Sequence, residues 1–180
     1  MMLREPLADG PVTLKTLDAA AAKEPYLGWL RDREVGRFLE VRFAEHSEQS
    51  LSQFIDKSNA APNVVLAGIF LYGNHVGNIK VSVDRNHGRG EMGIMIGERS
   101  AWGRGVARTA IKLLSDYAFR ELNVAKLTAG CYAGNIGSIR AFEAAGFQRE
   151  AVRRGHYVCD GARMDGVYLA RFAAGQETRT

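Results

Sequence analysis

The sequence predicts one α/β domain built on a mixed, largely antiparallel sheet that is flanked by helices. The 180 residues are 46% hydrophobic and 24% charged, which is typical of a single globular domain with its own core. Segments with the two-residue period of strands are interspersed with segments of helical period. Three strand-like segments follow one another through short turns, which indicates a meander and argues against a doubly wound dinucleotide fold.

The first half of the chain is expected to contain one strand, two helical regions and the meander. In order, these segments are a strand at 11–17, helices within 18–40 and 47–58, two strands within 63–84 and a strand at 90–97. Ile79, Val81 and Val83 alternate with polar residues, which is the period of a half-buried strand. Gly73-Asn74 separates the two strands of the central segment and predicts a tight hairpin turn there.

The second half is expected to alternate helices and strands and to end in a hairpin. In order, the segments are an amphipathic helix from residue 106, a strand at 125–132, a helix at 135–147 and two strands within 149–172. Asn135 is placed to cap the second helix and Gly146 to stop it. Asp160-Gly161 predicts the final turn, so that the sheet is expected to have seven strands.

Composition and charge restrict the environment and the partners of this domain. We expect the domain to span 1–173 and a flexible tail to span 174–180. The net charge of +4, without a continuous basic stripe, does not indicate nucleic-acid binding. No apolar segment is long enough to span a bilayer and the N-terminus lacks the apolar core of a signal peptide, so we expect no membrane partner and a cytoplasmic location. Cys131 and Cys159 lack metal-ligand spacing, which predicts reduced thiols and no metal.

The segment SAWGRGVARTAI, residues 100–111, places two glycines around an arginine immediately before a predicted helix. Gly103 and Gly105 allow the backbone to approach a ligand closely, and the first turn of a helix leaves amide groups unpaired. These features are typical of an anion-binding site. The spacing lacks the third glycine of a dinucleotide fingerprint and the Lys-Ser/Thr of a phosphate loop. By itself, the pattern also fits an ordinary glycine-rich turn that leads into a helix.

A second segment, NIGSIRAFEAAGF at 135–147, has the form N-x-x-S-x-x-x-F-E-x-x-G-F. Together with WGRGVA, it resembles the acetyl-coenzyme A binding motifs of the GNAT superfamily of N-acetyltransferases. The two segments are most similar to the branch related to the Rim-type ribosomal-protein N-terminal acetyltransferases. The resemblance covers about residues 10–172, and it implies a single GNAT-like domain whose sheet splays between its fourth and fifth strands.

The resemblance implies that the anion is the pyrophosphate of acetyl-CoA, bound by backbone amides of residues 103–107 at the helix N-terminus. It also implies that backbone groups of the fourth strand align the pantetheine arm and that Asn135 hydrogen bonds to it. The residues expected to bind acetyl-CoA are Ile94, Met95, Ile96, Trp102, Gly103, Arg104, Gly105, Val106, Ala107, Asn135 and Ser138.

Acetyl transfer to an amine requires a base for the amine and an acid for the departing thiolate. Many superfamily members carry a tyrosine in the helix of the second motif, but Phe142 stands at this position here. The resemblance to the Rim-type branch therefore makes Ser138 the candidate acid; a small polar residue in a first helical turn is the alternative interpretation. Glu91 is the candidate base on the same ground, with an ordinary exposed strand carboxylate as the alternative. His87 and His156 are the other candidate bases, because imidazole titrates in the required range.

Residues 26–43 resemble the acceptor region of Rim-type enzymes and of relatives that acetylate amino sugars on nucleotide carriers. Tyr132 and Tyr157 are candidates for the acceptor site, although core packing explains them equally well. We expect an acetyl-CoA-dependent N-acetyltransferase that acts on a primary amine, such as an amino sugar on a nucleotide carrier, by direct attack in a ternary complex. The alternatives are acetylation of peptide or ribosomal-protein N-termini and a non-catalytic acyl-CoA-binding module. Because family members are often dimers, the resemblance also implies a homodimer.

Overall fold

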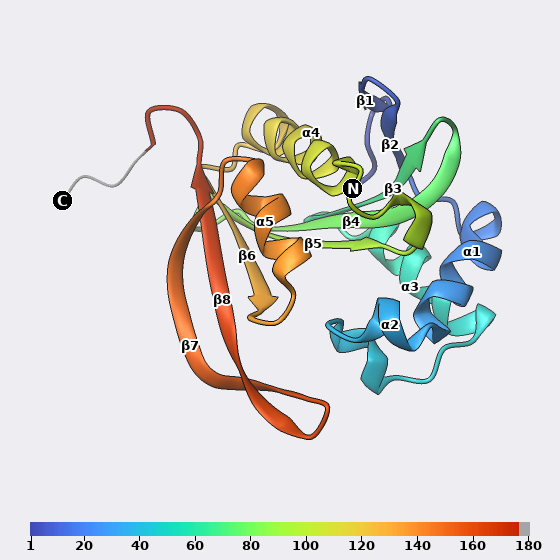
Figure 1. Ribbon diagram of the computed structural model, residues 1–180. Coiled ribbons are helices and arrows are strands. Elements are labelled where there is room, and N and C mark those ends of the chain that lie inside the picture. The colour runs from blue at the N-terminus through green and yellow to red at the C-terminus, as the bar shows by residue number, and fades with distance from the viewer. Residues whose placement is uncertain (177–180) are drawn as a thin grey trace.

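The computed structural model describes residues 1–176 and shows a twisted sheet with helices on both faces (Figure 1). Within these residues, eight strands form one sheet in the order β1-β2-β3-β4-β5-β6-β8-β7. The β5–β6 pair is parallel and the other neighbouring strands are antiparallel, which confirms the expected mixed sheet. The strands are β1 (Leu7–Asp9), β2 (Val12–Thr16), β3 (Val64–Leu71), β4 (Asn74–Asp84), β5 (Arg89–Ile96), β6 (Lys126–Tyr132), β7 (Gln148–Cys159) and β8 (Ala162–Phe172).

The helices fall into a group before the meander and a group after it. The first group is α1 (Ala19–Arg31), α2 (Arg33–Gly36), the 3-10 turn η1 (Glu40–Phe43) and α3 (Glu48–Ala60). The second group is the 3-10 turn η2 (Arg99–Ala101), α4 (Val106–Glu121) and α5 (Ile136–Ala144). Every described helix is too short or too polar to cross a membrane.

The expected number of seven strands is wrong because β1 is an additional strand. It pairs with β2 through the turn at Gly10, whose φ is +55°. A strand of three residues is too short to show an alternating pattern, so the sequence carries no signal for it. Of the tail expected at 174–180, residues 177–180 lie outside the described residues; the Gln176 amide donates to the Ala173 carbonyl at 3.0 Å and closes a turn.

The two predicted hairpin turns differ in how closely the sequence located them. The β7–β8 turn lies at Asp160 and Gly161, with φ values of +50° and +79°, as expected. The β3–β4 turn lies at Tyr72-Gly73 instead of Gly73-Asn74, and Tyr72 has a φ of +50°. A large side chain rarely adopts this left-handed conformation, which is why the sequence pointed one residue further along.

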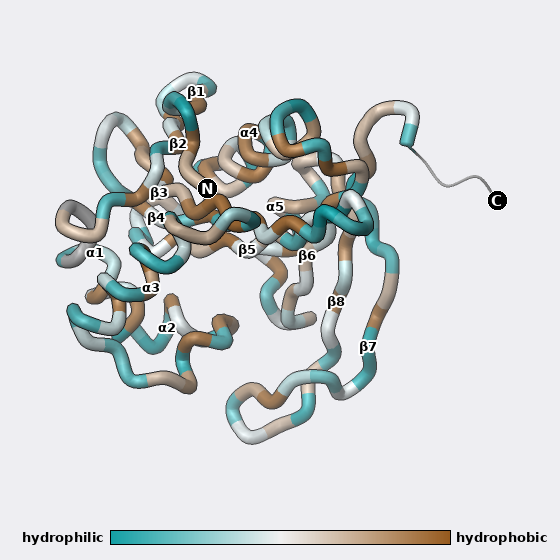
Figure 2. The backbone as a smooth tube through the Cα atoms, turned by 180° about the vertical axis from the view of Figure 1, so that it is seen from behind, coloured by the Kyte–Doolittle hydropathy of each residue, from teal (hydrophilic) through white to brown (hydrophobic). Residues whose placement is uncertain are grey.

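Two hydrophobic clusters hold the helices against opposite faces of the sheet. α4 contributes Ala110, Ile111 and Leu114, which are fully buried against one face. On the other face, α1 and α3 pack around buried residues such as Trp29 and Ile55. Figure 2 shows the hydrophobic residues concentrated where the central strands meet these helices.

β5 and β6 diverge in the middle of the sheet. Their parallel pairing is confined to residues 89–91 and 126–128, although β5 continues to Ile96 and β6 to Tyr132. Beyond this point, the side of β5 that faces β6 has backbone groups without a ladder partner. The splay expected between the fourth and fifth predicted strands is therefore confirmed, and it opens the sheet next to the N-terminal ends of α4 and α5 (Figure 1).

Candidate functional site

The turn before α4 holds both glycines of the first motif in the left-handed region. The φ of Gly103 is +72° and that of Gly105 is +77°, values that residues with a side chain rarely adopt. Gly105 is the N-cap of α4, and its carbonyl accepts a hydrogen bond from the Thr109 amide at 3.1 Å. The amides between these residues have no acceptor within the helix. The turn thus presents hydrogen-bond donors at the positive end of a helix, as anion binding requires.

A cavity of about 730 Å³ lies beside this turn, within the size range of small-molecule sites. It brings together the splayed end of β5, the start of α4 and the start of α5, which are far apart in the sequence. The residues of the predicted acetyl-CoA site that line it are Ile94, Met95, Ile96, Trp102, Gly103, Gly105, Val106, Ala107, Asn135 and Ser138. Arg104 is exposed and is not among the lining residues. The role of all these residues in binding stays a prediction.

The start of α5 is organised by the second motif. Asn135 is the N-cap, and its side-chain oxygen accepts a hydrogen bond from the Ser138 amide at 3.2 Å. Gly137, Ala141 and Ala144 also line the cavity, and the sequence analysis missed them. Their spacing of four and three residues puts them on one helical face, so small residues at this period were the signal that could have found them. Their small side chains leave room beside α5.

Positive charge predominates around the cavity. Arg37, Arg108 and Arg140 line it, against the single carboxylate of Glu34. Arg108 lies in the first turn of α4, close to the unpaired amides. An anionic ligand therefore meets both backbone donors and guanidinium groups here.

The candidate acid Ser138 lies beside a buried thiol. Its hydroxyl is 3.5 Å from Cys131 Sγ, and Cys131 is 4% exposed. Burial raises the pKa of the Cys131 thiol, so the thiol stays protonated near neutral pH. Phe142, at the position where many superfamily members carry a tyrosine, packs edge-to-face on Phe147 in the core. Ser138 is the candidate acid that reaches the cavity.

The candidate base Glu91 is exposed at the last residue of the β5–β6 pairing, where the strands begin to diverge. It does not line the cavity; its side chain lies on the face of the sheet opposite α4, because the neighbouring Met92 is buried against α4. His87 is exposed in the β4–β5 turn, at the end of β5 away from the cavity. His156 is exposed on β7 and packs edge-to-face on Tyr157. Of these three candidate bases, Glu91 is the one closest in sequence to the point where β5 and β6 diverge.

The two tyrosines expected at the acceptor site stack on each other. The ring centroids of Tyr132 and Tyr157 are 3.9 Å apart. The Tyr132 hydroxyl donates to Glu40 and accepts from Arg42 at 3.0 Å. Burial and the Glu40 carboxylate raise the pKa of Tyr132, and Arg42 opposes them only in part. The raised pKa keeps the phenol protonated. Both tyrosines therefore join β6 and β7 to η1, and Tyr132 itself is buried.

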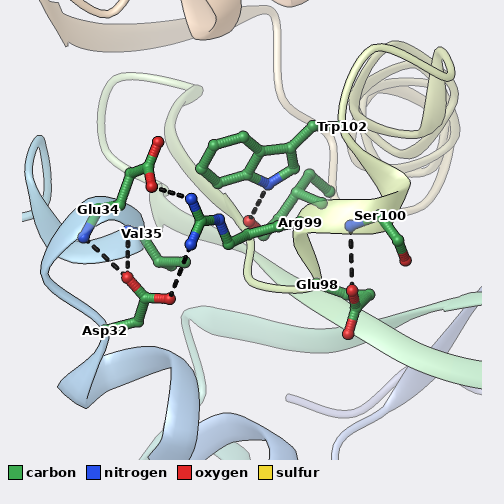
Figure 3. Close-up of polar contacts among 8 residues, drawn as sticks. Asp32, Glu34, Val35, Glu98, Arg99, Ser100 and Trp102 are labelled. Atoms are coloured by element: carbon green, nitrogen blue, oxygen red, sulfur yellow. Dashed lines mark hydrogen bonds and ion pairs between the residues drawn. The ribbon is translucent and has the colours of Figure 1, made fainter.

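Residues 32–43, which comprise α2, η1 and their connection, form a strap that closes the third side of the cavity. At one end, Arg99 of η2 forms ion pairs with Glu34 and Asp32, next to Trp102, whose indole nitrogen donates to the Ile96 carbonyl at 2.8 Å (Figure 3). At the other end, Arg37 pairs with Asp160 of the β7–β8 turn at 2.9 Å. The strap is thus linked to η2 at one end and to the β7–β8 turn at the other through exposed ion pairs.

The family of acetyltransferase (GNAT) domains matches residues 12–148, a range that contains both motifs. The chain belongs to the GNAT acetyltransferase family. The family expected from WGRGVA and NIGSIRAFEAAGF is therefore confirmed. The N-acetyltransferase p20 of Bacillus licheniformis, itself uncharacterized, is 34% identical over 87 residues, which are 48% of the chain and 48% of that protein. The matched segments span less than half of the length of the curated relatives.

Solved structures show the same fold. The spermidine N-acetyltransferase from Vibrio cholerae, in complex with CoA and spermine, is similar with a TM-score of 0.81 at 20% identity, over 93% of this chain and 99% of that chain. RimL, a ribosomal L7/L12 α-N-protein acetyltransferase in complex with coenzyme A, is similar with a TM-score of 0.82 at 13% identity, over 93% and 98%. At these identities, the likeness confirms the expected fold.

Proposed function

We propose that this protein is an acetyl-CoA-dependent N-acetyltransferase that acts on a primary amine of a small molecule. The observation that carries the proposal is the single cavity lined by both GNAT motifs and by the splayed end of β5. Membership of the GNAT family supports it, as do two proteins of the same fold whose structures contain coenzyme A.

The residues around the cavity fit coenzyme A. A Cβ atom added to Gly103 or Gly105 would have no atom within 4 Å, so the adjacent amides are open to a pyrophosphate. Arg108 and Arg140 would supply cationic partners, and the small residues on α5 leave space for an extended arm. Backbone groups at Ile94 and Met95 on the side of β5 away from β4 would orient that arm, because β6 does not pair with β5 there. When bound, acetyl-CoA supplies the acetyl group as an activated thioester.

Glu91 and Ser138 would share the two proton transfers of the reaction. As the C–N bond to the acceptor amine forms and the C–S bond breaks, the amine loses a proton and the sulfur gains one. Glu91 would accept the first proton, directly or through a water, from the face of the sheet opposite α4. Ser138 would donate the second from its place in the cavity and recover it from solvent. Atoms and charge balance without a metal or a redox step.

A turnover assay tests the proposal. Free thiol released from acetyl-CoA would be measured with an amino sugar on a nucleotide carrier, simple amines, polyamines and short peptides as acceptors. We expect release above the acceptor-free rate with small amines. Turnover restricted to peptides would favour N-terminal acetylation, and tight binding of coenzyme A without any turnover would favour a non-catalytic binding module. A protein that does not bind coenzyme A in a calorimetric titration would refute all three.

The assembly and the extent of the domain also remain proposals. We propose a homodimer, which light scattering in solution would distinguish from a monomer. We further propose that the domain ends at about residue 173, because β8 ends at Phe172. Removal of residues 174–180 should then leave the melting temperature unchanged.

A further inference from the structure

The middle of the sheet is uncovered on the face opposite α4. Glu91 and Gly93 of β5 and Gly130 of β6 are exposed, although these strands lie at the centre of the sheet. The alternating residues Gly90 and Met92 are buried on the α4 side. α1 and α3 cover only the neighbouring part of this face, where they pack on residues such as Leu66 of β3. A central strand without a covering layer is a place where a ligand can reach the splay.

Gly93 has no packing reason to be glycine. Of the glycines in β4 and β5, a Cβ added to Gly77 would come within 2.3 Å of the Met95 carbonyl oxygen, and one added to Gly90 would come within 2.8 Å of Leu127. A Cβ added to Gly93 would have no atom within 4 Å, and its φ is outside the left-handed region. Glycine weakens a strand interior and there often marks a close approach of a ligand. The empty volume above Gly93 is therefore available to a ligand.

Two opposite charges flank this empty volume. Lys80 of β4 is the direct cross-strand neighbour of Gly93, and Glu91 precedes Gly93 by two residues on the same face. Neither the Lys80 ammonium nor the Glu91 carboxylate forms a hydrogen bond or ion pair with the residues that the structure describes, although Lys80 is half-buried. Cross-strand neighbours have Cβ atoms about 5 Å apart, and residues two apart on a strand are separated by about 7 Å. One small molecule that carries a positive and a negative group can therefore lie over Gly93 and contact both side chains.

From this arrangement we propose that the acceptor is an amine with an anionic group, a carboxylate or a phosphate, a few bonds from its nitrogen. The inference rests on the proposed function and specifies its acceptor. The ammonium group lies beside Glu91, the anionic group binds Lys80, and the carbon skeleton lies over Gly93. A polyamine would place a second ammonium beside Lys80, and the carboxylates of Glu34 and Glu40 already pair with Arg99 and with the Tyr132 hydroxyl. Lys80 and Gly93 are thus specificity-determining residues.

Matched acceptors test the proposal. The pairs are phenylalanine with phenylalaninamide, 2-aminoethyl phosphate with ethanolamine, and glucosamine 6-phosphate with glucosamine. We expect the anionic member of at least one pair to have a kcat/KM about tenfold or more above that of its neutral analogue, because an ion-paired hydrogen bond is lost in the neutral one. The pairs also distinguish a carboxylate from a phosphate. Equal use of both members in every pair would overturn the proposal.

Variants at the two positions separate specificity from folding. Lys80→Met should abolish the preference for the anionic acceptor, Lys80→Arg should keep it, and Lys112→Met, which removes an exposed charge from α4, should have no effect. Gly93→Val should raise the acceptor KM about tenfold or more without lowering the melting temperature, because its side chain points into open space. Retained preference in Lys80→Met or an unchanged KM in Gly93→Val would contradict the inference.

Binding measurements keep this test independent of turnover. Each acceptor would be titrated calorimetrically into the wild-type protein saturated with coenzyme A, and the anionic members should bind more tightly than the neutral ones. Absence of both binding and turnover for all anionic acceptors overturns the inference. A failure of the proposed function is recognised separately, because the titration with coenzyme A alone then shows no binding.

Discussion

The wall of the cavity formed by α4 and α5 and the wall formed by the strap differ in what holds them. Val106 and Ile139, at the starts of α4 and α5, are each 2% exposed and belong to the main core. The strap is held at its ends by Arg99 with Glu34 and by Arg37 with Asp160, pairs whose side chains are all more than half exposed. Exposed ion pairs contribute only about 0–1 kcal/mol each, whereas buried aliphatic side chains contribute about 1.5–3 kcal/mol each. The wall formed by α4 and α5 is therefore held by buried contacts, whereas the ends of the strap are held by weaker exposed pairs. Between its ends, the strap is anchored by the buried Val35 and by Arg42, which donates to the Tyr132 hydroxyl.

This difference matches the two tasks of the proposed enzyme. Coenzyme A is the same molecule in every turnover, so a wall held by buried contacts, with preformed amide donors, suits it. The acceptor must enter, react and leave, and the exposed ion pairs at the two ends of the strap can open at small cost. Variants in the α4–α5 wall, in the strap and at the uncovered face test this difference.

The largest expected effect is on catalysis at the uncovered face. Glu91→Gln keeps the shape of the side chain but removes the base, so turnover at neutral pH should fall by roughly a hundredfold. A higher pH should restore part of the rate, because more of the acceptor amine is then neutral. The pH profile of kcat/KM measures this. Glu150→Gln, at an exposed carboxylate of β7, is the control and should keep the wild-type profile. A wild-type profile in Glu91→Gln would shift attention to His87, His156 or an unassisted amine.

The second largest effect is expected on coenzyme A binding at the wall formed by α4 and α5. Gly105→Val forces a branched residue to a φ of +77°, which costs about 1–3 kcal/mol, and places its side chain where an anion would bind. Calorimetric titration should show coenzyme A binding weakened about tenfold or more. Gly73→Val is the control, because Gly73 lies in the β3–β4 turn with a φ of +84° and equally open space around its Cβ, but outside the cavity. Unchanged affinity in a folded Gly105→Val protein would remove the basis for placing the pyrophosphate at this turn.

Ser138→Ala should have a smaller effect, because a thiolate leaves more readily than most leaving groups. We expect the rate to fall by about tenfold at every pH, since the acid is absent whatever the state of the amine. The affinity for coenzyme A should be almost unchanged, because the Asn135 cap and the α4 amides remain. Ser138→Thr, which keeps a hydroxyl, should recover much of the rate. If the alanine variant showed the pH-dependent loss expected for Glu91→Gln, the division of roles between the two residues would be wrong.

The smallest effect should come from the strap. Arg99→Gln removes the ion pairs to Glu34 and Asp32, and exposed pairs of this kind contribute at most about 1 kcal/mol. Amide hydrogen exchange in residues 32–43 should therefore accelerate by about fivefold or less, while residues of α4 keep their protection. Arg149→Gln removes the comparably exposed pair with Glu143 and should leave the strap unchanged. Faster exchange throughout α4 would contradict the independence of the two walls.

The sequence was a good guide wherever the structure depends on residues close together in the chain. The helix at 135–147 could be located from its cap Asn135 and its stop Gly146, and the structure shows both. The turn at Asp160-Gly161 was found because both residue types tolerate positive φ. The turn at Tyr72-Gly73 was misplaced by one residue, because the pairing of β3 with β4 forces an aromatic residue into a conformation it does not prefer.

The candidate site divides in the same way. Both motifs could be read from the chain, because an amide turn and a helix N-terminus are made by a few consecutive residues. The strap could not, because Glu34 and Arg37 take their places through Arg99 and Asp160, which lie 65 and 123 residues away. The face of α5 formed by Gly137, Ala141 and Ala144 is an intermediate case. The spacing of these small residues is visible in the sequence, but only the structure shows that they line a cavity.

By itself, the sequence determined the α/β architecture, the family and the two segments expected to bind acetyl-CoA. Only the tertiary structure decided at which residue β5 and β6 part, that Lys80 lies beside Gly93, and that the strap closes the cavity. The physical reason is the range of the interactions. Caps, left-handed glycines and amphipathic periods act within one or two turns of chain, whereas strand register and ion pairs between distant segments exist only after the core has brought those segments together.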